Sequence, residues 1–129
     1  SAASGSCSLV RVTDVVRSDA DNLLPGAAPV PVLEYSVTNA TAFPIDVAVA
    51  TGVTDDAHGV AGLVTTLLLQ PSGTAVTAPL GAVPTTESLR LAPGQTARVA
   101  YAVALADTVG DEAQASTVSF DSTVTARQA

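Results

Sequence analysis

Two segments in the second half of the chain alternate between apolar side chains and polar or small ones. In residues 96–106 the odd positions are apolar, and in residues 116–126 the apolar side chains fall on even positions. Successive side chains of a β-strand point to opposite faces, so a period of two predicts two strands that each turn one face to a core. Residues 107–113 interrupt the alternation with a glycine and three carboxylates, which predicts a loop. The last strand presents apolar side chains for the core or for an assembly surface, namely Val118, Phe120 and Val124.

The remainder of the chain is also divided into short strand-like segments by turn residues. Residues 30–39 and 43–50 both alternate, and the short turn between them predicts a β-hairpin, followed by a loop at residues 51–59. Two Pro-Gly pairs, at residues 25–26 and 93–94, predict turns. No segment has the 3.6-residue period of an amphipathic helix. The prediction is an all-β protein, a jelly-roll-like or Ig-like antiparallel β-sandwich of about eight strands, with one domain over residues 8–128.

The composition limits where the protein acts and what it binds. The chain has 129 residues, 47% of them hydrophobic, and none of its apolar runs is long enough to span a membrane. Its net charge is −7 and it contains no lysine, which disfavours nucleic acid and anionic lipid as partners. It starts with the small residues SAASGS, which look like the mature side of a cleaved signal peptide. Together these features predict a secreted protein, extracellular or at the cell surface.

Few side chains are suited to catalysis. His58 is the only histidine, the HExxH zinc motif is absent, and there is no Gly-x-Ser-x-Gly elbow around a serine nucleophile. Cys7 is the only cysteine, so it is predicted to be buried, free or paired between chains, and it cannot form a disulfide within its own chain. We therefore predict no enzymatic activity and no cofactor.

Two acidic segments and one asparagine are candidates for other sites. Residues 19–22 offer alternate oxygens to a calcium ion, and so does the acidic loop at 107–112, but neither matches the twelve-residue calcium loop, and polar turns explain both equally well. Asn39 begins the sequence Asn-Ala-Thr, which is a formal N-glycosylation signal. It falls in a turn that is predicted to be exposed.

Residues 1–12 form a predicted N-terminal arm of small residues that becomes strand-forming towards its end. Such an arm can pair with its own sheet, or it can add as a strand to the next molecule. Head-to-tail donation does not close on itself and produces filaments. The strand predicted at residues 8–17 places Val10, Val12 and Val16 on one side. The candidate donor side chains are Cys7, Leu9, Val10 and Val12.

The C-terminal strands also carry a resemblance to a known family. An apolar strand, a short loop with Asp, Gly, an acidic residue and Gln114, and then a strand with Val118-Ser-Phe120 that closes on Ala-Arg-Gln128 resemble the end of the TasA/camelysin family of secreted proteins. The segment Leu23-Leu-Pro-Gly26 is similar to the family's Leu-x-Pro-Gly turn. This chain has Asp111 where the family usually has Asn. The resemblance implies a jelly-roll-like sandwich, export, and assembly into extracellular fibres of a biofilm matrix by strand donation.

The leading prediction is a structural subunit that assembles head-to-tail with copies of itself, and with other components of a matrix, by strand donation. The alternative is a monomeric secreted β-sandwich that acts as an adhesion or ligand-binding module. The oligomeric state distinguishes the two hypotheses.

Overall fold

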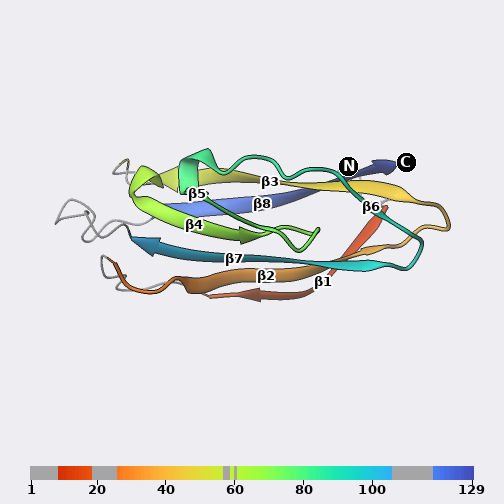
Figure 1. Cartoon of the computed structure of the whole chain (residues 1–129), viewed down its shortest axis with the longest axis horizontal. Helices are drawn as coiled ribbons and strands as arrows, with labels where there is room; N and C mark the ends of the chain where they lie inside the picture. The colour runs from red at the N-terminus through yellow and green to blue at the C-terminus, as the bar shows by residue number, and fades with distance from the viewer. Residues whose placement is uncertain (1–8, 19–25, 57–58, 60, 106–117) are drawn as a thin grey trace.

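The structure is a computed structural model that describes residues 9–18, 26–56, 59, 61–105 and 118–129. Strands dominate these residues, two short 3₁₀ turns accompany them, and this part of the chain contains no α-helix (Figure 1). The 3₁₀ turns are η1 (Ala61–Leu63) and η2 (Leu80–Ala82). The strands are β1 (Val10–Arg17), β2 (Val30–Asn39), β3 (Ile45–Asp56), β4 (Val64–Leu69), β5 (Ala75–Pro79), β6 (Leu89–Leu91), β7 (Thr96–Leu105) and β8 (Val118–Gln128).

The strands form two antiparallel sheets that enclose one core. The larger sheet has five strands in the order β1-β2-β7-β4-β5, and the smaller has three in the order β6-β3-β8. Every pairing between neighbouring strands is antiparallel. The predicted all-β antiparallel sandwich of eight strands is confirmed.

The predicted hairpin between residues 30–39 and 43–50 is wrong. Strand β2 pairs with β1 and β7, whereas β3 pairs with β6 and β8 in the other sheet. Residues 40–44 therefore carry the chain across the sandwich, and Pro44, which has no backbone N–H for a ladder, ends this crossing. Strand β3 also continues to Asp56, so most of the loop predicted at residues 51–59 belongs to the strand.

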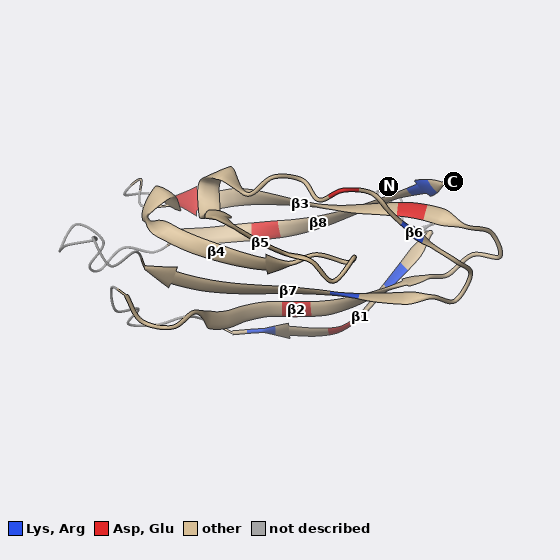
Figure 2. Cartoon of the chain, viewed as in Figure 1, with Lys and Arg blue, Asp and Glu red and all other residues tan. Residues whose placement is uncertain are grey.

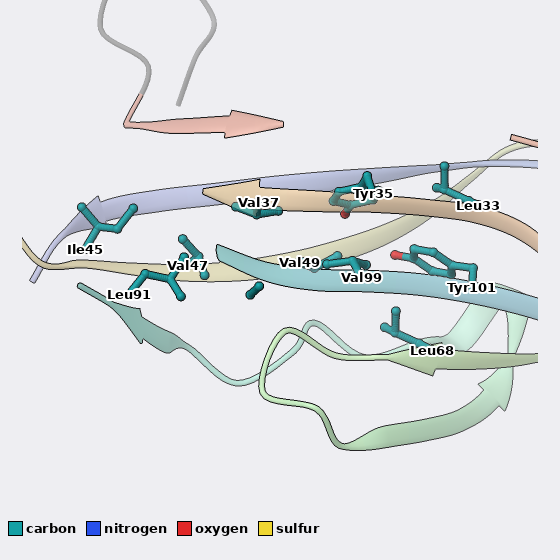
Figure 3. Packing of buried hydrophobic residues seen from close by; sticks show 11 residues of the cluster. Leu33, Tyr35, Val37, Ile45, Val47, Val49, Leu68, Leu91, Val99 and Tyr101 are labelled. Atoms are coloured by element: carbon teal, nitrogen blue, oxygen red, sulfur yellow. The ribbon is translucent and has the colours of Figure 1, made fainter. Parts of the chain in front are cut away.

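The core is built almost entirely from Val, Leu, Ile and Tyr side chains (Figure 3). In β7 every second residue is buried, as the alternation in the sequence predicts, and β7 lies between β2 and β4 at the centre of the large sheet. The buried cluster comprises Leu33, Tyr35, Val37, Ile45, Val47, Val49, Leu68, Leu91, Ala97, Val99 and Tyr101.

A chain of hydroxyl groups crosses the middle of this core. The Ser122 Oγ on β8 lies 2.6 Å from the Tyr35 hydroxyl on β2 and accepts a hydrogen bond of 2.9 Å from the Tyr101 hydroxyl on β7. The Tyr101 hydroxyl also lies 2.7 Å from Thr51 Oγ1 on β3, and its ring packs on Phe120 with centroids 5.1 Å apart. Burial raises the pKa of Tyr35 to about 12, with the hydrogen bond to Ser122 opposing this shift and Tyr101 adding to it. Strand β8 thus lies over the pair β2–β7.

The second predicted Pro-Gly turn is present, whereas of the first only Gly26 lies within the described residues. Gly26 and Gly94 have φ angles of 75° and 77°, in the left-handed region that glycine adopts without steric cost. In the second turn the backbone N–H of Gln95 donates to the carbonyl of Ala92 over 2.9 Å, which closes a type II turn with Pro93 at its second position. This turn leads directly into β7.

Candidate assembly surface

The four edge strands of the two sheets differ in how well they are protected. Strand β5 has only five residues and ends at Pro79, and β6 has three. Beyond β6 the small sheet is continued by Thr86, whose backbone N–H donates to the Val49 carbonyl over 2.9 Å while its hydroxyl accepts from the Val49 N–H over 2.9 Å. Short edges and covered edges resist pairing with other chains. The two remaining edges, β1 and β8, are long.

Strand β1 pairs with its own sheet and exposes a row of valines. Val10 lies opposite Asn39 and Val12 opposite Val37, so these two candidate donor residues are part of the protein's own large sheet. Leu9 and Val10 are half-buried against the core. Within the described residues the arm therefore follows the first of the two predicted alternatives, pairing with its own sheet. Cys7 and the rest of residues 1–8 lie outside the described part of the chain.

The expected grouping of Val10, Val12 and Val16 on one side of this strand is wrong. The register shifts between Thr13 and Val16, where Asp14 has a φ of 55° and forms a bulge. After the bulge Val16 lies opposite Glu34 on the outer face of the sheet, so its neighbour Val15 points to the core side together with Val12. Val12, Val15 and Val16 are 45%, 52% and 56% exposed.

Strand β8 is the longest unguarded edge among the described residues. It has eleven residues, pairs only with β3, and has no proline and no lysine. Its half-buried side chains Val118, Phe120 and Val124 pack against the core, and Ser119, Asp121 and Thr123 face outward, as predicted. In a strand paired on one side, every second residue turns its N–H and C=O to the open edge. Strand β8 therefore turns a row of backbone N–H and C=O groups to an edge at which no other described strand pairs.

The two open edges lie on the same side of the sandwich because the sheets are offset. Ser122 on β8 contacts both Tyr35 and Tyr101, so β8 faces β2 and β7, and β1 extends one strand further than β2. Val12 and Val15 remain about half exposed on the core side of β1, the strand beyond β2. We name the edge of β8 that pairs with no other described strand, together with Val12 and Val15, the open strand position.

Asn39 is not in an exposed turn, and that prediction is wrong. It is the last residue of β2 and is 1% exposed. Its Nδ2 donates to the carbonyls of Phe43 and Leu91 over 2.8 and 3.0 Å, and its Oδ1 accepts from the N–H and hydroxyl of Thr41 over 2.8 and 2.7 Å. A glycan on Nδ2 would displace these bonds and has no room in the folded protein. The asparagine and threonine of the signal instead fix the corner where the chain changes sheets.

Charged groups in the described residues are few and spread along the strands (Figure 2). They include the ion pairs Arg90–Asp46 at 3.2 Å and Arg98–Glu34 at 2.8 Å; the Arg90 side chain is exposed, whereas that of Asp46 is only 19% exposed. The outer face of the small sheet has a shallow depression of about 310 Å³, between Asp46 and Arg127. The described residues include no group of three side chains that could hold a metal ion. His58 and both predicted calcium segments lie outside the described residues.

Some features of this surface escape sequence reasoning. Ser122, a polar residue on an apolar face, bonds both core tyrosines, and the only signal for it in the sequence is the break that this serine makes in the even row of β8. The bulge is signalled by the Asp14-Val15-Val16 doublet, which interrupts the alternation of β1.

No helix in the described part of the chain is long and apolar enough to cross a membrane. No protein-family model, curated protein or solved structure matches the chain. The resemblance to the TasA/camelysin family stays a prediction.

Proposed function

We propose that this protein is the structural subunit of an extracellular filament or biofilm matrix fibre, in which copies join head-to-tail by strand donation. The observation that carries the proposal is the open strand position, where an eleven-residue edge without proline lies beside two half-exposed valines. Monomeric β-proteins protect such edges with lysines, prolines, bulges or covering loops, and β8 itself contains no lysine and no proline. An edge left open in this way suits a protein whose partner is a strand of another copy.

Strand addition would stabilise the joint through two contributions. The added strand satisfies the outward backbone groups of β8, and each buried backbone hydrogen bond contributes about 0.5–1.5 kcal/mol. It also covers Val12 and Val15, and burial of a valine side chain contributes roughly 1.5 kcal/mol or more. Ordering the donor opposes these gains at about 1–2 kcal/mol per residue, so the joint needs most of the length of β8. A joint of this kind leaves one donor and one acceptor free at the two ends of any assembly, which allows a filament to grow.

The resemblance of the C-terminal strands to the TasA/camelysin family supports the same proposal. The low content of charged side chains, 13%, suits a surface that makes extensive contacts with other copies and with other matrix components. We assign no catalytic role and no cofactor.

A monomeric secreted adhesion or ligand-binding module is the second candidate. The observation that favours it is the depression of about 310 Å³ on the outer face of the small sheet, lined by polar and small side chains around Asp46 and Arg127. Its shallow shape offers little buried area to a ligand, and we therefore rank this candidate second.

The test is direct imaging of the purified full-length protein by negative-stain electron microscopy, with sedimentation velocity on the same samples. We expect filaments and a population of large assemblies. The matched variant Thr123→Lys places a charge on the outward row of β8 without touching the core, and we expect it to shorten the filaments or abolish them. A full-length protein that stays monomeric over a range of pH and calcium concentration would overturn the proposal in favour of the monomeric module.

A further inference from the structure

We propose that two copies of this protein pair through the outer faces of their large sheets, where leucines on β4 of one copy pack against alanines on β7 of the other. This face lies on the side of the large sheet away from the core, and β8 forms no part of it. The inference therefore goes beyond the proposed function and does not depend on filament formation.

The outer face of the large sheet is apolar over β4 and β7. Strand β4 buries every second residue, which leaves Leu67 and Leu69 on the outer face, where they are 37% and 36% exposed. On β7 the outward residues beside them are alanines, namely Ala100, Ala102 and Ala104. An antiparallel sheet that packs one face on a core normally turns polar side chains to water on its other face. The leucines and alanines of this face depart from that pattern.

Strand pairing makes these side chains one continuous surface, because residues directly opposite each other lie on the same face. Leu67 lies opposite Ala102, which lies opposite Pro31 of β2 on its other side. Leu69 lies opposite Ala100 in the next row. Strand β5 extends the surface beyond β4 with the outward residues Ala75, Thr77 and Pro79. We name this surface, from Pro31 across β7 and β4 to β5, the apolar patch.

Charged side chains border the apolar patch rather than fill it. Strands β4 and β5 carry no charged residue, and β7 carries only Arg98, which binds Glu34 of β2 over 2.8 Å at one end of the patch (Figure 2). The outer face of the small sheet differs, because Asp46, Asp121 and Arg127 lie on it. With a net charge of −7, two copies repel each other least where a nearly uncharged face meets another. Exposed apolar patches of this kind mark sites of protein–protein contact.

The shape of the apolar patch is complementary to itself. Leucine side chains project further than alanine side chains, so β4 forms a ridge and β7 forms a groove about 4.8 Å beside it. A two-fold axis parallel to the strands, between β4 and β7, places the ridge of each copy over the groove of the other. The strands of the two sheets then stay roughly aligned, as in ordinary sheet packing. Because each copy supplies both a ridge and a groove, the contact closes as a dimer and its occupant is a second copy.

The area of the apolar patch determines how strong this dimer is. The strands β5, β4, β7 and β2 are together about 19 Å wide, and the six residues of β4 span about 20 Å. The contact therefore covers about 400 Å² on each copy and about 800 Å² in total, which is half of a standard interface and lies in the range of weak complexes. We expect a reversible dimer that forms at protein concentrations of about 0.1–1 mM.

The test is sedimentation equilibrium of the full-length protein at concentrations up to about 1 mM. Every sample carries Thr123→Lys, which is designed to block strand addition at β8, so that filaments do not obscure a dimer. We expect a monomer–dimer equilibrium. Leu67→Lys places an unpaired charge on the ridge and should raise the dimer Kd by about tenfold or more. The matched control Thr125→Lys, on the outward row of β8, should leave the Kd unchanged.

The variant Ala102→Leu distinguishes this packing from non-specific association. It enlarges the apolar surface but fills the groove that receives Leu67 of the second copy, so we expect it to weaken the dimer. Stronger association of Ala102→Leu would overturn the inference, and so would a protein that stays monomeric up to about 1 mM. If that monomer also loses stability with Leu67→Lys, other residues of the same chain cover the patch. Filament formation is tested separately with Thr123 intact, so neither result decides the other.

Discussion

Replacing Asn39 with alanine should destabilise this protein more than any other single change to a polar residue described here. The side chain of Asn39 makes four hydrogen bonds of 2.7 to 3.0 Å and is 1% exposed. It joins the end of β2 to the Phe43 carbonyl in the crossing segment and to the Leu91 carbonyl at the end of β6. Its backbone adds two more links, because the Asn39 N–H donates to the Gln95 carbonyl and its own carbonyl accepts from the Gly94 N–H, both over 3.0 Å.

The expected magnitude follows from what the substitution leaves behind. Alanine removes both donors from Nδ2, and the Thr41 N–H loses its side-chain acceptor. A typical buried hydrogen bond contributes about 1 kcal/mol, and a buried polar group left without a partner costs about 1–3 kcal/mol. The Phe43 carbonyl keeps the Thr41 hydroxyl as a donor, which limits the loss. We expect the free energy of unfolding to fall by about 3 kcal/mol, which lowers Tm by about 10 °C.

Urea denaturation monitored by far-UV circular dichroism measures this change. Thr123→Ala, on the exposed row of β8, is the control, and it should alter the free energy of unfolding by less than about 0.5 kcal/mol.

The variant Asn39→Asp gives a second test of the same corner. It keeps Oδ1 as an acceptor but places a carboxylate oxygen against the carbonyls of Phe43 and Leu91. It should be destabilising at pH 7 and partly recover as the pH falls, because burial raises the pKa of the new carboxyl above its unfolded value. An Asn39→Ala loss below about 1 kcal/mol would refute the role of this corner.

Three further predictions concern single groups. Thr66→Val should raise the free energy of unfolding by about 1 kcal/mol, since the buried Thr66 hydroxyl has no hydrogen-bond partner within the described structure; a lower denaturation midpoint would show that the hydroxyl is bonded. The urea denaturation midpoint of the wild-type protein should fall as the pH rises from 10 to 12. The unfolded state loses the Tyr35 proton near its ordinary pKa of 10.0, whereas the folded state loses it only near a pKa of about 12. The Tyr35→Phe variant should therefore lose most of this pH dependence. Gly94→Ala should lower the free energy of unfolding by about 1 kcal/mol, because Gly94 has a φ of 77°. Gly62→Ala, at a negative φ with open space around it, should leave the free energy of unfolding unchanged in urea denaturation.

The sequence pattern predicted the strands better than their partners. The period of two identifies which side chains face a core, and it located β2 at its observed bounds and β7 within one residue. It contains no information on which sheet a strand joins, because both sheets of a sandwich face the same core. Strands β2 and β3 therefore looked like a hairpin, although they pack across the core from each other.

Long-range partners and bulges caused the other errors. Asn39 looked like an exposed turn residue because its neighbours are small and polar, but the Leu91 carbonyl that helps to bury it lies 52 residues away in the sequence. Alternation counted through β1 assigned Val16 to the wrong face, because the bulge at Asp14 inserts one residue. The open edge of β8 was predictable in kind, as a long regular strand without lysine or proline, but its position opposite β2 and β7 depends on how the two sheets pack on each other.

The hydroxyl chain between Tyr35, Ser122 and Tyr101 also gives the small sheet a fixed alignment. The inward row of β8 is otherwise a series of apolar side chains, and a strand at the edge of a sheet can slide by two residues while keeping the same face inward. Such a slide would bring Phe120 or Val124 to the Tyr35 hydroxyl in place of Ser122, and a buried hydroxyl left without a partner costs about 1–3 kcal/mol. The Tyr101 hydroxyl would lose Ser122 but keep Thr51 on β3. The hydrogen bonds of Ser122 thus favour a single register of β8 along the sandwich. A chain that adds to β8 therefore pairs with a strand whose register is already fixed.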